Sequence, residues 1–145
     1  MAYQNSFSFK FLILLIVVCA FESREISAGL FGRVTVTIIN NVTIDSNPTD
    51  IEVHCKSKDD DLGFHTLKFD ESYDFSFKPN MIPFKTTLFF CSFTWSGDSK
   101  LHYIDIYNDR IDDCNECKWN IRRGGGCKYM KETDSFSSCL HWNKS

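Results

Sequence analysis

The sequence TLFFCSFTW at residues 87–95 alternates between two sets of side chains. Phe89, Cys91 and Phe93 share one face of an extended chain, together with the residues at both ends of the segment, and the even-numbered residues share the other. Successive side chains of a β-strand point to opposite faces, whereas a helix repeats every 3.6 residues. The pattern therefore predicts a strand that is buried on one face and partly covered on the other.

The same two-residue period recurs on both sides of this segment. Further alternating or β-branched runs lie at residues 34–38, 51–55, 73–77, 103–107 and 117–121, with shorter runs around 127–130 and 135–140. Clusters of turn-forming residues, such as Gly124-Gly125-Gly126, separate the runs, and the sequence shows no amphipathic helix. Short strands at about ten-residue spacing predict an all-β fold. We expect a small antiparallel β-sandwich of about seven or eight strands, stabilised by disulfides.

The aromatic residues follow the alternation. Those expected to face the core are Phe75, Phe77, Phe89, Phe93, Trp95 and Trp119. Phe90 and Tyr107 fall on the other side of their strands, where we expect them under loops or at an interface.

An apolar run near the N-terminus, FLILLIVVCAF at residues 11–21, follows a polar start and precedes charged residues. A membrane-spanning helix needs about 20 apolar residues, so this run is too short to span a bilayer. It predicts a secretory signal peptide at residues 1–20, with cleavage as late as residue 28. The alternative is a buried N-terminal helix. We therefore expect one secreted, extracellular domain at residues 29–145 that is not inserted in a membrane.

The composition narrows the function classes. The 145 residues are 43% hydrophobic with a net charge of −3, which excludes wholesale disorder and argues against a nucleic-acid partner. The sequence lacks an HExxH motif, a glycine-rich phosphate loop and a recognisable nucleophile motif. We therefore predict no catalytic residues, no metal and no cofactor. A hydrolase with paired carboxylates stays open, because the spacing of such a pair is three-dimensional.

Six cysteines follow the signal peptide, an even number that suits three disulfides in an exported chain. They are Cys55, Cys91, Cys114, Cys117, Cys127 and Cys139. Cys114 and Cys117 form a CxxC motif, but it precedes a predicted strand instead of starting a helix, which favours a structural disulfide over a redox or zinc site. Sequence alone does not choose the pairing. The predicted closing hairpin favours Cys127–Cys139, and inward-facing Cys55 and Cys91 are candidates to bridge to Cys114 and Cys117 across the sandwich.

Two exposed loops are candidate recognition sites. The first is the acidic stretch Asp59, Asp60 and Asp61, which lacks the ligand spacing of a calcium-binding EF-hand loop and which we interpret as a solvated turn or a binding loop. The second contains Ser96, Asp98 and Lys100. The sequon Asn41-Val42-Thr43 predicts N-glycosylation at Asn41, where a strand meets a turn.

Several motifs stand in a characteristic order along the chain. They are HCKSKDDDLG at residues 54–63, YDFSF at 73–77, TLFFC at 87–91 followed by Phe93 and Trp95, and CKW at 117–119 after Cys114. From about residue 34 to 143, this order resembles the plant self-incompatibility protein family, the S-protein homologues. Cys127, Cys139 and Trp142 resemble a six-cysteine branch of that family.

The resemblance implies a secreted, disulfide-bonded sandwich of two antiparallel sheets without known catalysis. It also implies an extracellular ligand in plant cell–cell communication, with reproductive signalling as one form of it, whose partner is a membrane receptor protein on a plant cell. We expect the protein to be a monomer. The alternatives are a secreted defence or inhibitor protein and, third, a small secreted hydrolase.

Overall fold

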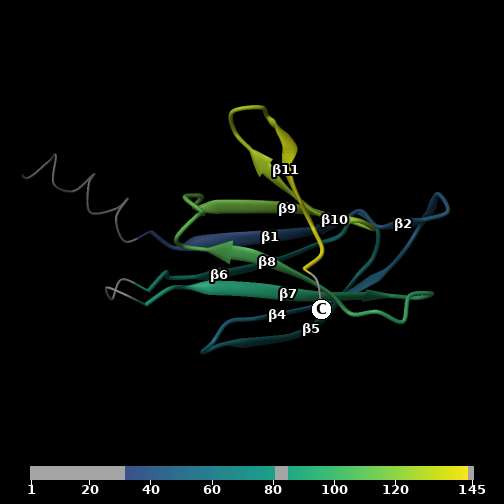
Figure 1. Cartoon of the computed structure of the whole chain (residues 1–145), viewed down its shortest axis with the longest axis horizontal. Helices are drawn as coiled ribbons and strands as arrows, with labels where there is room; N and C mark the ends of the chain where they lie inside the picture. Colours follow the sequence, from purple (N-terminus) through teal and green to yellow (C-terminus); the bar gives the residue numbers. More distant parts are fainter. Residues whose placement is uncertain (1–31, 81–84, 144–145) are drawn as a thin grey trace, which may run out of the picture. The chain divides into compact units, whose positions relative to one another are not determined.

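The structure, a computed structural model, describes residues 32–80 and 85–143, and all the regular elements of these residues are β-strands (Figure 1). The chain divides into two compact units, residues 1–32 and 33–145, and the strands all belong to the second. The predicted signal peptide lies outside the described residues. The all-β fold class predicted from the two-residue period is confirmed.

Nine strands of six to eight residues form two sheets. The five-stranded sheet has the order β11-β10-β9-β1-β6 and contains β1 (Val34–Asn40), β6 (Ser72–Phe77), β9 (Glu116–Arg122), β10 (Gly125–Met130) and β11 (Ser135–His141). The four-stranded sheet has the order β5-β4-β7-β8 and contains β4 (Ile51–Lys56), β5 (Asp61–Leu67), β7 (Leu88–Trp95) and β8 (His102–Asn108). The β10–β11 hairpin extends away from the neighbouring strands of its sheet (Figure 1).

The described residues contain eleven strands, more than the seven or eight expected. Two of them, β2 (Thr43–Ile44) and β3 (Asn47–Pro48), pair only with each other and are too short for alternation to reveal them. The third addition is β5, whose first residues we predicted as a turn. Its alternation is interrupted at Gly63, which has a positive φ of 74°.

The two sheets share one hydrophobic core, as a sandwich requires. Rings from β6 in one sheet contact β7 in the other, with centroids 5.2 Å apart for Phe75 and Phe89 and 4.5 Å apart for Phe77 and Phe89. Residues of β1, β4, β8 and β9 complete the same buried cluster. Pairing is antiparallel except between β1 and β9, which run parallel.

Strand β7 is buried as its sequence predicts. Phe89, Cys91, Phe93 and Trp95 are all buried, and its other face is partly covered. The prediction that Tyr107 faces away from the core is wrong, because this side chain is 4% exposed. A β-bulge between β7 and β8 explains the error: Phe89 pairs with Tyr107 but Phe90 pairs with Asp105, so the alternation of β8 breaks.

All six cysteines of the described residues form disulfides, and the pairing corrects one expectation. Cys127–Cys139 staples the β10–β11 hairpin as predicted. Cys55 and Cys91 do not bridge to the CxxC cysteines across the sandwich; they pair with each other, and Cys114 pairs with Cys117. Cys55 and Cys91 stand directly opposite one another on β4 and β7, with Cα atoms 4.0 Å apart, so no other cysteine competes for them.

A buried asparagine fixes the loop that carries the predicted sequon. The side chain of Asn40 is fully buried at the end of β1. Its Nδ2 donates to the carbonyl oxygens of Thr49 (2.8 Å) and Leu67 (3.0 Å), and its Oδ1 accepts from the amide of Val42 (3.0 Å). Both ends of the amide are therefore satisfied, and the 41–49 segment is held against the end of β5.

Candidate functional site

The two predicted recognition loops lie at opposite ends of the four-stranded sheet. In the pairing of β4 with β7, Lys56 stands opposite Phe90 and Ile51 stands opposite Trp95. The turn that follows Lys56 is thus at the start of β7, whereas the loop that contains Ser96, Asp98 and Lys100 follows its end. At about 3.4 Å per residue, the eight residues of β7 keep the two loops about 25 Å apart.

The first loop is a solvated turn that closes on itself. The Ser57 Oγ accepts from the amide of Asp60 (3.0 Å) and donates to the Asp60 carboxylate (3.3 Å). Asp59 and Asp60 are exposed, and they line a hollow of about 420 Å³ together with Phe77 at the end of β6. Among the described residues, no three His, Cys, Asp or Glu side chains are grouped to hold a metal ion.

Asp61 differs from its two neighbours because three groups bind its carboxylate. His54 Nε2 is 2.5 Å from Oδ1, Lys56 Nζ is 3.1 Å from Oδ2, and the amide of Gly63 donates to Oδ1 at 3.0 Å. These hydrogen bonds hold the pKa of Asp61 well below its usual range. The bond from His54 contributes most, followed by those from Gly63 and Lys56. Asp61 is an organising residue of the sheet surface rather than a free loop carboxylate.

A bulge in β5 brings this cluster together. The pairing of β4 with β5 passes from His54–Phe64 to Lys56–Asp61, so Leu62 and Gly63 stand opposite Cys55 alone. The extra residue lets Asp61 and Phe64 lie on the same side of β5, although three positions separate them. The positive φ of Gly63 is the conformation that such a bulge requires of glycine.

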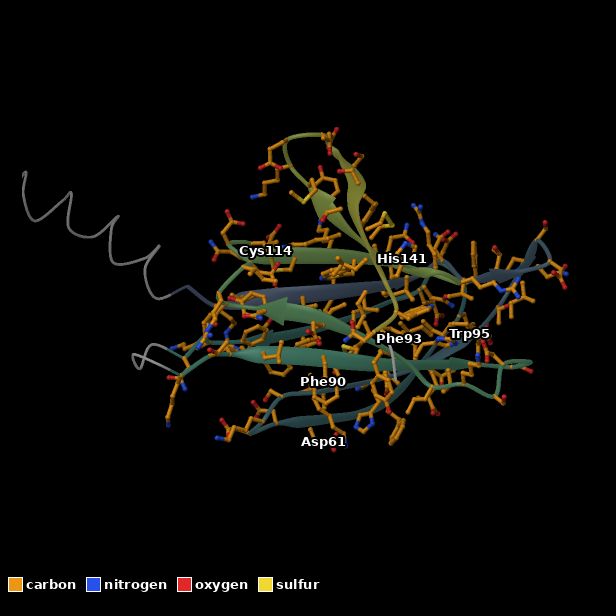
Figure 2. All side chains as sticks on the ribbon, viewed as in Figure 1. Asp61, Phe90, Phe93, Trp95, Cys114 and His141 are labelled. Carbon is orange, nitrogen blue, oxygen red and sulfur yellow. A yellow bond between two sulfur atoms is a disulfide. The ribbon has the colours of Figure 1, made fainter. Side chains whose placement is uncertain are left out.

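The outer face of the four-stranded sheet carries two rows of side chains. One row runs Asp61–Lys56–Phe90–Asp105 across the strands and the next runs Phe64–His54–Ser92–Tyr103. Figure 2 shows Asp61 and Phe90 on this outer side, whereas Phe93 and Trp95 lie between the sheets. Phe64 is 67% exposed and contacts the His54 ring at a centroid distance of 4.0 Å.

The second loop is tied to the interior. The Asp98 carboxylate accepts from the amide of Lys100 (2.9 Å) and lies 3.0 Å from His102 Nε2, and these hydrogen bonds, His102 first, lower the pKa of Asp98. The His102 ring stacks on Trp95, with centroids 4.5 Å apart and planes 4° from parallel. Trp142 completes the cluster 5.1 Å from His102.

Trp142 also joins the C-terminal segment to both sheets. Its Nε1 donates to the carbonyl oxygen of Arg123 (2.8 Å), and the next amide, that of Asn143, donates to the carbonyl oxygen of Tyr103 in β8 (2.8 Å). Ser96 and Lys100 remain exposed, and Ser96 borders an open hollow beside the β2–β3 hairpin.

Asn41 follows directly after β1, as its sequence predicts. Its side chain is partly exposed, and Nδ2 donates to the Asp70 carboxylate at 3.2 Å. Thr43 of the sequon is exposed. Glycosylation at this position stays a prediction.

The sheet topology and the disulfides define the chain as a small, covalently cross-linked β-sandwich. Residues 35–142 match the family model described as plant self-incompatibility protein S1. The chain therefore belongs to this family, as the sequence motifs suggested, and the matched range agrees with residues 34–143 expected from those motifs. Among residues 32–80 and 85–143, no helix is long and apolar enough to cross a membrane.

Individual relatives agree with the family match. The chain is 44% identical to S-protein homolog 2 of Arabidopsis thaliana over 118 residues, which is 77% of this chain and 69% of the relative. It is 43% identical to S-protein homolog 5 of the same plant over 133 residues, covering 87% and 95% respectively. A solved structure with a TM-score of 0.53 and 16% identity covers 79% of this chain and 97% of its own. That structure is described as an SPH protein, from a widespread family of small, highly stable, secreted plant proteins.

Proposed function

We propose that this protein is a secreted, non-enzymatic recognition protein of plants that acts as an extracellular ligand for a membrane receptor protein. The observation that carries the proposal is the placement of the motif at residues 54–63. This stretch lies within the residues that match the family, and it supplies the turn and the Asp61 cluster on an exposed sheet face. An exposed, rigidly held surface suits binding to a large partner.

The histidines support binding better than hydrolysis. His54 and His102 each contact an aspartate, but within the described part of the chain no Ser or Cys side chain hydrogen-bonds to either ring. A nucleophile within hydrogen-bond reach of its base is the usual mark of such a hydrolase. We therefore interpret both pairs as structural and leave catalysis out of the proposed function.

The test is binding of the tagged, fully oxidised protein to intact cells of the source plant's reproductive and vegetative tissues. We expect saturable binding that excess untagged protein abolishes. A reduced and alkylated sample serves as the control for non-specific adsorption. If the folded protein binds no tissue, the ligand function is wrong, and assays of microbial growth and of secreted-enzyme inhibition then address the defence alternative.

A further inference from the structure

The outer face of the four-stranded sheet exposes aromatic side chains that do not contribute to the core. Phe64 is more than half exposed, and Phe90 and Tyr103 are partly exposed on the same face. Exposing three aromatic rings on one sheet face costs solvation free energy without adding to the core. Neighbouring strands of a sheet lie about 5 Å apart, so the patch is about 15 Å wide across its four strands.

Acidic side chains surround these rings. Phe90 stands directly between Lys56 and Asp105. Glu52 lies on the same face, two residues before His54 in β4. Glu52 and Asp105 are exposed, and among the described residues neither forms an ion pair. Among the described side chains of this face Lys56 is the one lysine or arginine, and its Nζ already lies 3.1 Å from the Asp61 carboxylate. The face therefore has uncompensated negative charge beside exposed rings.

The outer face of the other sheet provides an internal comparison. Outward positions of β1, β6 and β9 carry no aromatic ring, and their charges balance: Asp74 and Glu116 against Lys118 and Arg122. Both faces belong to the same sandwich and meet the same solvent. On the β10–β11 hairpin of the same sheet, Tyr129 and Phe136 form a partly exposed ring pair with centroids 5.6 Å apart, and the Tyr129 hydroxyl donates to Asp134. The combination of exposed rings with carboxylates that form no ion pair thus distinguishes the four-stranded sheet from the β1, β6 and β9 part of the other sheet.

Rings beside carboxylates match one kind of cation particularly well. The arginine guanidinium stacks on aromatic faces and donates paired hydrogen bonds to a carboxylate, whereas a lysine ammonium does neither as effectively. Ser92 is a small residue between His54 and Tyr103, so the row is lowest at β7, where an inserted side chain has most room. Arginines that alternate along an extended segment would project on one side, towards the sheet.

We propose that this face, which we call the aromatic–acidic face (Glu52, Asp61, Phe64, Phe90, Tyr103 and Asp105), binds a basic, extended segment of a partner protein through arginine side chains. The inference rests on the proposed recognition function, because it assigns the surface and the chemistry of the partner. The arginine guanidinium groups would stack on Phe64, Phe90 or Tyr103. They would also donate hydrogen bonds to the carboxylates of Asp105 and Glu52. No covalent step is involved.

The direct test is a titration of the ¹⁵N-labelled, oxidised protein with a blocked Arg-Val-Arg-Val-Arg peptide, followed by backbone NMR. We expect amide shifts confined to β4, β5, β7 and β8, and weaker binding at high salt. Phe64→Ser and Asp105→Asn together should weaken binding about 10-fold. The matched pair Phe136→Ser and Asp74→Asn, on the other sheet, should leave it unchanged. A Glu-Val-Glu-Val-Glu peptide that binds equally, or shifts that map to the five-stranded sheet, would overturn the inference.

Cell binding separates this inference from the proposed function. If the unmodified protein and the control pair bind cells but the Phe64 and Asp105 variant does not, the aromatic–acidic face is the receptor surface. If all three bind equally, the ligand function stands and the assignment of the face is wrong. If none binds, the ligand function fails, and the peptide titration still decides whether the face takes arginine.

Discussion

Both ends of the four-stranded sheet hold a histidine–aspartate pair, but the pairs face opposite ways. His54 and Asp61 lie on the outer face, where Phe64 covers the histidine and remains exposed itself. His102 faces the interior, between Trp95 and Trp142, whereas its partner Asp98 belongs to the loop that follows β7. The same two residue types thus organise an exposed sheet surface at one end and close the core at the other. The neighbours on each strand, not the pair itself, decide which role results.

The two ends also differ in what holds β7 to its surroundings, and the Asp61 end should show one of the two largest effects. There, the disulfide Cys55–Cys91 closes a loop of 36 residues in sequence. Replacing both cysteines by alanine should lower the free energy of unfolding by about 4 kcal/mol, because the unfolded chain loses its cross-link. Urea unfolding of the oxidised protein measures this. The same double replacement at Cys114 and Cys117 should cost about 2 kcal/mol, since that bridge spans only three positions. Equal losses would contradict the explanation.

The Asp98 end depends on aromatic packing instead. Trp95→Ala removes a ring that is 6% exposed and should lower the free energy of unfolding by about 3–5 kcal/mol. Phe64→Ala, at the opposite end, should change it by less than about 0.5 kcal/mol, because that ring is 67% exposed. Chemical denaturation of both variants tests the contrast. A large loss from Phe64→Ala would mean that the exposed ring is structural.

Each end also contains one glycine with a positive φ, Gly63 at 74° and Gly97 at 86°. A Cβ at either position meets no atom within 4 Å, so backbone strain alone should set the cost of alanine there. We expect about 1–2 kcal/mol for each substitution. Gly63→Ala should in addition shift the NMR signals of the His54 ring, because the Gly63 amide helps to hold Asp61. Unchanged His54 signals would show that the bulge survives the substitution.

The smallest effects concern pH. The folded-state pKa of both aspartates is lowered, so each ionised carboxylate stabilises the fold above its unfolded pKa of about 3.9 and loses that contribution as the pH falls below it. Asp61→Asn should therefore reduce the loss of stability between pH 5 and pH 2, and Asp98→Asn should reduce it less. Thermal unfolding across that range measures both variants. Because Asp61 is 56% exposed, 1 M salt should narrow the difference. A steeper acid dependence in Asp61→Asn would reverse the assigned sign.

The sequence predicted those features that depend on alternation or on contacts between residues adjacent in the chain. Strand β7, the inward rings and the Cys127–Cys139 hairpin bridge are of this kind. The predictions failed where a strand contains an extra residue. The bulge at Gly63 concealed β5, and the bulge opposite Phe90 reversed the expected side of Tyr107. A period of two cannot report a register shift, since the shift depends on the partner strand.

The candidate site was only partly accessible from sequence for the same reason. The sequence predicted one acidic loop that contains Asp59, Asp60 and Asp61. In the fold, Asp61 is separated from the other two and lies beside His54 and Lys56. Phe64 was missed as a surface residue. The available signal was Gly63 directly before it, since a glycine that interrupts a strand pattern marks a bulge.

The parallel pairing of β1 with β9 has a consequence for how the protein folds. β1 is the first strand of the domain. Its edge towards β9 stays unpaired until β9 has been synthesised, since Val36 pairs with Cys117. Contacts of such long sequence separation slow folding, because the intervening chain has to be ordered first. As the chain emerges during synthesis, β4 and β7 can meet and form their disulfide well before β1 is enclosed. The hydrophobic first strand thus keeps one edge unpaired until β9 has been synthesised, and during that time it needs protection against aggregation.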